Sequence, residues 1–200
     1  MTALCAHMLV DRGALDVDAP VARYWPEFAQ AGKASITTRQ LLCHSAGLAG
    51  IRAPLSIDAL YDWTAMTDAL ARETPWWEPG TANGYHAITF GYLVGEVIRR
   101  ISGRSVGTFL RDEVTQPLGI DFHIGLADPS DSRIGEMVPP RAAPTADASG
   151  GIDPASMIGK VMGNPPLRAR SANLPAWRRA EIPAANGHGN ARSVARVMAA

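Results

Sequence analysis

The sequence reads Trp77-Glu78-Pro79-Gly80-Thr81-Ala82-Asn83-Gly84-Tyr85-His86-Ala87 immediately before its most regular apolar segment. Proline and glycine recur through residues 75–84, which predicts a loop because both residue types interrupt regular structure. Residues 88–101 then carry apolar side chains at helical spacing, and the Ser-Gly pair at 102–103 is typical of a helix end. The chain therefore presents an aromatic hydroxyl, that of Tyr85, where a loop enters a strong helix.

The same spacing predicts further helices on both sides of this segment. We expect them to begin at the first residue, at Thr37 or Thr38, at Asp58, at Ser105 and at Asn190. The helix capped by Asp58 should continue through Arg72. Residues 128–189 are rich in Pro, Gly, Ala and Ser, which predicts a wrapped surface excursion with short helical turns. Strand-like alternation is scarce, so the sequence predicts a mostly helical chain that begins and ends within helices.

Composition favours a globular protein without a nucleic-acid or membrane partner. Hydrophobic residues make up 46% of the 200 residues, and 19 basic side chains balance 19 acidic ones. No apolar run reaches the roughly 18 residues of a membrane span. We expect Cys5 and Cys43 to be buried free thiols, and the histidines lack zinc-ligand spacing. No metal or cofactor is expected, and the cytoplasm is the default location because the N-terminus does not resemble a signal peptide.

Five segments occur in an order and spacing that together point to a known family. They are Leu-Asp-Val-Asp-Ala-Pro-Val at 15–21, Ile-Thr-Thr-Arg-Gln-Leu-Leu-Cys-His-Ser-Ala-Gly-Leu at 36–48, the Trp-x-Pro-Gly segment that leads to Tyr85, Gly-Tyr-Leu-Val-Gly-Glu-Val-Ile at 91–98, and Pro-Leu-Gly at 117–119. In combination they resemble the serine β-lactamase-like hydrolases, which include class C β-lactamases, DD-peptidases and esterases, and the esterase-like members most closely. The resemblance implies the α/β fold of that family (β-lactamase/transpeptidase-like), here mainly its helical part with long loops and few strands.

The resemblance also implies acyl-transfer chemistry. In the family, a serine in Ser-x-x-Lys attacks an ester or lactam carbonyl, a Tyr-x-Asn tyrosine assists proton transfer, and a Lys/His-Thr-Gly strand helps to bind substrate. Tyr85 matches the tyrosine and is the expected catalytic residue. Ala87 stands where the asparagine would be, a departure shared by esterase-like members. Hydrolysis of a small-molecule carboxylic ester through an acyl-serine intermediate is therefore expected, rather than hydrolysis of a β-lactam.

Two required elements of that machinery, the Ser-x-x-Lys and the Lys/His-Thr-Gly motifs, do not occur in the sequence. The chain contains only two lysines, Lys33 and Lys160, and the residues three positions before them are Gln30 and Met157, so there is no Ser-x-x-Lys. A phenol, with its ordinary pKa near ~10, needs a cationic neighbour to act as a base at neutral pH. We expect the nucleophile segment before residue 1 and the substrate-binding strand after residue 200. Residues 1–200 are then a partial hydrolase domain that is inactive alone.

The remaining candidate site residues allow more than one interpretation. Trp76, Trp77 and His86, together with the loop at 135–170, could line the substrate pocket, but core packing explains the tryptophans almost as well and His86 has no role implied by the resemblance. The motif at 44–47 could be a nucleophile elbow, yet a helix precedes it where the elbow needs a strand. We expect Ser45 there to bond a backbone group and Gly47 to take positive φ.

Two further functions stay open at this stage. The chain could be a non-catalytic module that binds a ligand or partner in the remaining cleft. Alternatively, the full-length protein could hydrolyse β-lactams or D-Ala-D-Ala peptides. The sequence leaves the oligomeric state open.

Overall fold

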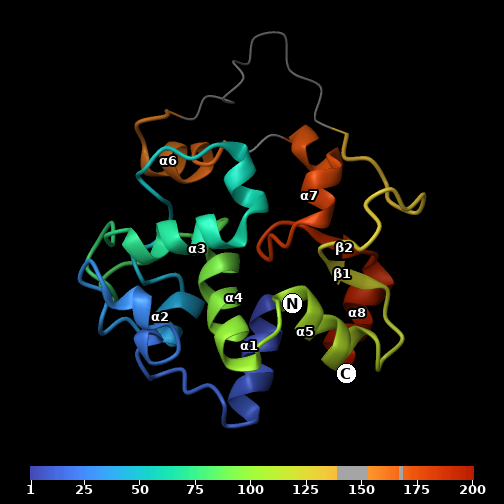
Figure 1. Cartoon of the computed structure of the whole chain (residues 1–200), viewed down its shortest axis with the longest axis horizontal. Coiled ribbons are helices and arrows are strands. Elements are labelled where there is room, and N and C mark those ends of the chain that lie inside the picture. The colour runs from blue at the N-terminus through green and yellow to red at the C-terminus, as the bar shows by residue number, and fades with distance from the viewer. Residues whose placement is uncertain (139–152, 167–168) are drawn as a thin grey trace.

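Helix α4 (Thr89–Ser102) is the central element of the structure, a computed structural model that describes residues 1–138, 153–166 and 169–200 (Figure 1). Most of its residues from Thr89 to Ile98 are buried, as expected of a helix surrounded by other elements. The helix ends where Gly103 adopts a left-handed conformation, with φ of 70°, and donates its N–H to the Arg99 carbonyl. The helix predicted at residues 88–101 is therefore confirmed to within one residue at each end.

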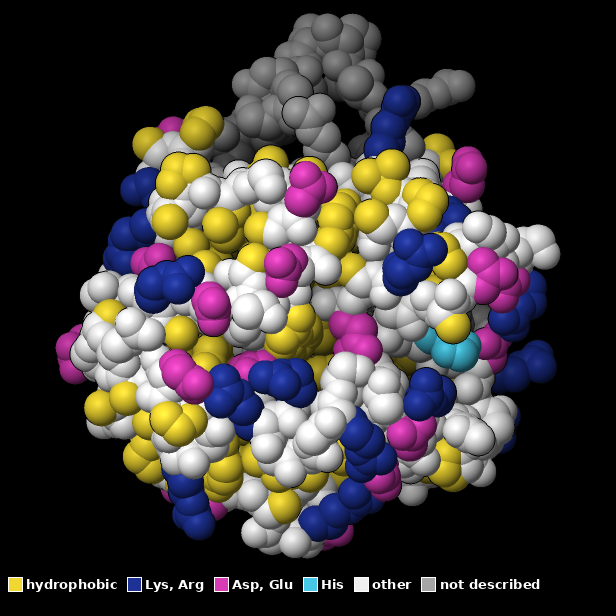
Figure 2. All heavy atoms as spheres, in the orientation of Figure 1, with side chains coloured by type: hydrophobic (Ala, Val, Ile, Leu, Met, Phe, Trp, Pro, Cys, Tyr) yellow, Lys and Arg dark blue, Asp and Glu magenta, His cyan; other side chains and the backbone are white. Residues whose placement is uncertain are grey.

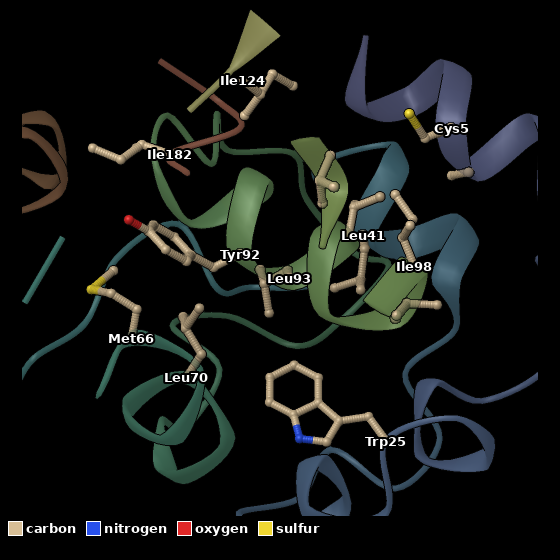
Figure 3. Close-up of a cluster of buried hydrophobic side chains, with 14 of the residues drawn as sticks. Cys5, Trp25, Leu41, Met66, Leu70, Tyr92, Leu93, Ile98, Ile124 and Ile182 are labelled. Atoms are coloured by element: carbon tan, nitrogen blue, oxygen red, sulfur yellow. The ribbon is translucent and has the colours of Figure 1, made fainter. Parts of the chain in front are cut away.

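Four helices pack against α4: α1 (Thr2–Asp11), α2 (Thr38–Leu42), α3 (Trp63–Arg72) and α5 (Val106–Leu110). Their apolar side chains meet in one core (Figure 3). In that core Cys5 comes from α1, Leu41 from α2, Met66 and Leu70 from α3, and Tyr92, Leu93 and Ile98 from α4. Each large apolar side chain that becomes fully buried contributes roughly 1.5–3 kcal/mol. This shared core fixes the helices around α4.

Side-chain caps determine where α2 and α3 begin. Thr37 Oγ1 accepts a bond from Gln40 N at 3.3 Å, and Thr37 N donates to Gln40 Oε1 at 2.9 Å, so Thr37 is the cap of α2. The prediction for α3 is wrong at its start. Residues Ile57–Tyr61 form a separate 3₁₀ turn, and Asp62 rather than Asp58 caps α3, because Asp62 has an extended backbone that breaks the helix there.

The other described elements are short. They are 3₁₀ turns at Val21–Arg23, Pro26–Ala29 and Ala169–Asn173, a π-helical turn at Arg111–Thr115, helices α6 (Met157–Gly163), α7 (Pro175–Arg179) and α8 (Ala191–Ala199), and strands β1 (Phe122–Ile124) and β2 (Gly187–Gly189). The strands pair antiparallel, with His123 opposite His188. Asn190 caps α8, as predicted, by accepting a bond from Ser193 N. The described chain is thus mostly helical with a single two-stranded sheet.

Among the described residues, Lys33 is the one lysine or arginine in the buried interior. Lys33 is fully buried, and its Nζ donates to the carbonyls of Gln30, Ala71 and Glu73 at 2.9, 2.8 and 2.5 Å. Burial lowers the pKa of Lys33 to about 8, although nearby Glu73 acts in the opposite direction. All three donors of the ammonium group are used, so Lys33 joins the segment before α2 to the end of α3.

The surface carries mixed charge. Basic and acidic side chains alternate over the visible face, with apolar side chains between them (Figure 2). Cys5 is buried as predicted, whereas the prediction for Cys43 is wrong: Cys43 is exposed, because it follows the last residue of α2. Among the residues that the structure describes, none of the helices has the length and apolar character of a membrane span.

Candidate active site

Two of the sequence motifs form one hydrogen-bonded unit around Tyr85. Residues 44–48 lie beside the loop at 76–86, and three main-chain bonds join them: Gly84 N to His44 O at 3.1 Å, Gly80 N to Ser45 O at 2.9 Å, and Trp76 N to Gly47 O at 2.7 Å. Gly47 has φ of 75°, and a Cβ atom there would lie only 2.7 Å from the Trp77 carbonyl oxygen. Only glycine fits this position, as predicted. The motif at 36–48 is thus the frame that holds the Tyr85 loop.

Tyr85 lies on the wall of a cavity. Its side chain is 71% exposed, and the cavity has a volume of about 240 Å³. The other walls come from Met1, Thr2 and Ala3 at the start of α1, from His86, Ala87 and Phe90, and from residues 183–184. Thr2 Oγ1 donates to the Pro183 carbonyl at 3.0 Å, which ties the start of α1 to the third wall. The phenol and the first turn of α1 therefore border the same space.

His44 lines the same cavity, although the sequence did not identify it as a site residue. Its ring centroid lies 5.2 Å from that of Tyr85 and 5.0 Å from that of Phe90. His44 Nδ1 accepts a hydrogen bond from His86 N at 3.1 Å. The residue has φ of 58°, a left-handed conformation that is uncommon outside glycine and in which histidine is enriched. Both the left-handed backbone of His44 and its position next to Tyr85 are visible only in the structure, so the sequence alone could not identify this residue.

His86 also borders the cavity, but the main chain occupies both of its ring nitrogens. Nδ1 lies 2.6 Å from the Gly84 carbonyl, to which it donates, and Nε2 accepts from Leu48 N at 3.0 Å. The side chain is fully buried. Burial, assisted by nearby His44 and opposed by the bond to Gly84, lowers the pKa of His86 to about 4. His86 is thus neutral at pH 7 and braces the loop on either side of Tyr85.

The two tryptophans lie outside the Tyr85 cavity. Trp76 lines a separate space of about 880 Å³ with α6, stacks against Arg52 at 5.2 Å and donates its Nε1–H to Glu73. Trp77 donates its Nε1–H to the Ala82 carbonyl at 2.9 Å and meets His86 edge-on. The structure therefore brings Tyr85 and His86 together and places the tryptophans elsewhere. Part of the predicted pocket loop, residues 139–152 and 167–168, lies outside the described residues.

No cation able to activate the phenol lines this cavity among the described side chains. Lys33 is committed to three carbonyls in the core, and Lys160 borders the Trp76 space. Ser45 is buried, and its Oγ lies 3.5 Å from the Gln40 carbonyl, in line with the structural role predicted for it. Within the described ranges, no group of three His, Cys, Asp or Glu side chains could hold a metal ion. The geometry offers an exposed phenol beside a helix start.

Comparison with known proteins identifies relatives of this chain. The sequence model described as Beta-lactamase matches residues 1–200. The Esterase/beta-lactamase LipL of Mycobacterium tuberculosis (strain ATCC 25618 / H37Rv) is 36% identical over 219 residues, which cover 100% of this chain and 48% of that protein.

Solved structures give the same result. A family VIII carboxylesterase is 44% identical with a TM-score of 0.86, and the match covers 98% of this chain and 51% of that one. EstA from Arthrobacter nitroguajacolicus Rue61a is 34% identical with a TM-score of 0.87, over 100% of this chain and 53% of that one. The chain spans about half the length of these relatives. The predicted β-lactamase/transpeptidase-like fold is confirmed.

Proposed function

The chain belongs to the Beta-lactamase family. From this premise we propose that it contributes Tyr85, but not the serine nucleophile, to an ester-hydrolysing active site. In the proposed enzyme, Tyr85 relays a proton for a serine nucleophile. No Ser-x-x-Lys occurs in the 200 residues, so the proposal assigns the serine and its lysine to polypeptide outside them. Residues 1–200 then form part of one larger hydrolase domain.

The observation that carries this proposal is the exposure of Tyr85 beside the start of α1. A tyrosine that only anchors a loop tends to bury its ring, whereas this side chain is 71% exposed and borders a cavity with Met1, Thr2 and Ala3. The resemblance puts the nucleophile immediately ahead of this helix. A hydroxyl entering the cavity from that direction meets the phenol.

The proposed reaction follows the acyl-enzyme route. The serine oxygen attacks the ester carbonyl, its proton passes to the Tyr85 oxygen, and Tyr85 then protonates the departing alcohol. Water attacks the acyl-serine in the second half, gives its proton to the same oxygen, and the proton returns to the serine as the acid leaves. A lysine beside the serine supplies the positive charge that favours a deprotonated phenol oxygen at the start of each half-reaction.

The proposed substrates are small carboxylic esters. Ala87 replaces the family asparagine, and its methyl group cannot bond the amide of a β-lactam side chain or of a peptide. Two relatives are described as an esterase/beta-lactamase and as a carboxylesterase. Hydrolysis of β-lactams or of D-Ala-D-Ala peptides is the alternative substrate class for the same machinery.

A p-nitrophenyl ester assay tests the proposal on the chain extended through the Ser-x-x-Lys that the proposal requires. Tyr85→Phe removes only the hydroxyl, and we expect kcat to fall by about 10²–10⁴, which is the usual contribution of proton transfer by a positioned side chain. The matched control is Tyr61→Phe, because the Tyr61 hydroxyl is buried and has no hydrogen-bond partner among the described residues. The control should leave kcat within about twofold.

Equal activity of wild type and Tyr85→Phe contradicts the role of the phenol. The 200-residue chain assayed alone should give no turnover, because it lacks the nucleophile. If that chain instead binds an ester analogue tightly and the full reading frame encodes no Ser-x-x-Lys, the non-catalytic binding module becomes the better assignment.

A further inference from the structure

One residue holds both ends of the tripeptide whose centre is Tyr85. The His44 carbonyl accepts from Gly84 N at 3.1 Å, and the His44 side chain accepts from His86 N through Nδ1, also at 3.1 Å. Among the described residues, no hydrogen bond holds the Tyr85 hydroxyl itself. The placement of the phenol therefore depends on the main chain around it and on the His44 ring, 5.2 Å away between centroids.

This double contact requires the unusual backbone of His44. With φ of 58°, the residue directs its carbonyl and its imidazole to the same loop. Histidine is tolerated in this region at some conformational cost, so the position favours a residue whose side chain compensates with a bond. A glycine would adopt this backbone freely and keep the carbonyl contact, but it would offer no acceptor to His86 N.

The contact also fixes the protonation state of His44. Nδ1 must keep its lone pair to accept from His86 N, so the ring proton lies on Nε2, and an imidazolium would lose this acceptor. Burial lowers the pKa of His44, which favours the neutral ring. The other titratable groups near this ring are those of Tyr85 and His86, whose ring centroids lie 5.2 and 5.4 Å away, and Met1, with its amino group, lines the same cavity. No carboxylate is present among the described cavity-lining residues to favour the imidazolium.

We propose that His44 is the positioning residue for Tyr85, and that its neutral imidazole holds the loop in the geometry needed for proton relay. The catalytic part of this inference rests on the function proposed above; the structural part does not. Protonation of His44 releases His86 N and frees the phenol to move. A displacement of about 1 Å of a catalytic group can cost roughly 10² in rate.

The structural part is tested by NMR on the 200-residue chain labelled with ¹⁵N. We expect the ring nitrogens of His44 to show a proton on Nε2 at pH 7.5. The amide signal of His86 should move with the titration of the His44 ring rather than with that of its own ring. A proton on Nδ1 of His44 at pH 7.5, or a His86 amide that ignores the His44 titration, overturns the proposal.

Two substitutions test the catalytic part in the full-length hydrolase. His44→Asn keeps an acceptor near the position of Nδ1, and His44→Gly removes it, while both residues tolerate positive φ. We expect His44→Gly to lower kcat at least tenfold with little change in KM. His44→Asn should retain most of kcat at pH 7.5 and lose less activity than wild type on acidification. His7→Asn, at an exposed position of α1, is the control and should match wild type.

The outcomes separate the two proposals. If Tyr85→Phe has full activity, the proposed function fails, and the NMR result still decides whether His44 holds the loop. If Tyr85→Phe is impaired but His44→Gly is as active as wild type, His44 does not position the phenol. Equal impairment of His44→Asn and His44→Gly likewise contradicts the acceptor role, provided that denaturant unfolding shows both variants to be folded.

Discussion

At the scale of single residues, the imidazole of His86 couples pH to the stability of the loop that carries Tyr85. It donates to the Gly84 carbonyl and accepts from Leu48 N. An imidazolium cannot accept a bond, so protonation leaves Leu48 N without its partner. Because burial lowers the pKa of this ring to about 4, the folded chain resists protonation over a range in which the unfolded chain does not.

We predict that stability falls as the pH drops from 6.5 to about 4, because only the unfolded state binds a proton at His86 in that window. The displacement of the pKa from 6.5 to about 4 corresponds to roughly 3 kcal/mol. Urea unfolding at pH 7 and pH 4.5 measures this loss. In His86→Gln the free energy of unfolding should be lower at pH 7 and should depend less on pH. His7→Gln should follow wild type, and an unchanged pH slope in His86→Gln contradicts the prediction.

The sequence pointed to two residues that line the candidate site, Tyr85 and His86, but not to His44. Tyr85 follows from its motif, whereas the importance of His44 depends on a hydrogen bond to a residue 42 positions later and on a left-handed backbone. Neither property has a local sequence signal. Trp76 and Trp77 were predicted at the pocket from their place beside Tyr85 in the sequence, whereas neither lines the Tyr85 cavity, and their indole N–H groups bond to Glu73 and to the Ala82 carbonyl.

At the scale of elements, α4 contains a buried carboxylate that fixes it to α3. Glu96 is 1% exposed and accepts bonds from Trp63 Nε1, Arg99 Nε and Arg100 Nε, each at 2.7 Å. Burial alone raises the pKa of Glu96, but the hydrogen bonds from Arg99, Arg100 and Trp63 outweigh burial and leave the pKa below its usual value. The carboxylate is therefore charged in the folded state and fully paired.

We predict that Glu96→Gln lowers the free energy of unfolding at pH 7 by about 1–3 kcal/mol, because the amide keeps a bond to Trp63 but loses both charged pairs. The contribution of Glu96 is present above its unfolded pKa and is lost as the pH falls through the lower folded pKa. The difference between variant and wild type should therefore shrink in acid. Chemical denaturation at pH 7 and pH 3.5 measures it.

The matched control is Glu27→Gln, which removes the exposed acidic partner of Arg100. Exposed pairs contribute little, so this variant should stay within about 0.5 kcal/mol of wild type. If Glu27→Gln is as destabilised as Glu96→Gln, burial of the carboxylate is not the source of the effect.

Elements with strong local signals were predictable, and those that depend on distant partners were not. The apolar spacing and terminal glycine defined α4, and the Asn190 cap defined the start of α8. The start of α3 was missed because Asp58 and Asp62 are both acceptable caps and the backbone of Asp62 decides between them. Strand β2, Gly187–Gly189, contains two glycines and therefore has no alternating apolar pattern that would predict a strand. Its partner β1 lies more than 60 residues earlier, so the pairing also has no local signal.

At the scale of the whole molecule, residues 181–184 join parts of the chain that are distant in sequence. Pro183 accepts a bond from Thr2 at the start of α1, and Glu181 accepts from Ser105 Oγ at 2.5 Å and from Gly107 N at 2.8 Å at the start of α5. Pro183 and Ala184 of this segment form one wall of the cavity beside Tyr85. Its existence could not be predicted from the sequence, since its walls come from opposite ends of the chain.

The charge of Glu181 makes this closure dependent on pH in the direction opposite to that of His86. Burial raises the pKa of Glu181, although the bonds from Ser105 and Gly107 act against burial. Between the ordinary pKa of 4.5 and the raised folded pKa, the folded chain keeps a proton that the unfolded chain has lost. Stability therefore decreases as the pH rises through that window and stays lower above it.

We predict that Glu181→Gln is at least as stable as wild type at pH 7.5, because the neutral amide can accept from Gly107 N and donate to Ser105 Oγ without burying a charge. Glu181→Ala removes both contacts and should cost about 1–3 kcal/mol at every pH. Denaturant unfolding at pH 4.5 and pH 7.5 distinguishes the variants, and the advantage of Gln over Glu should be larger at the higher pH. A Gln variant that loses more stability at pH 7.5 than at pH 4.5 would show instead that the closing contact requires the anion, which would make the buried carboxylate a charged anchor for α5.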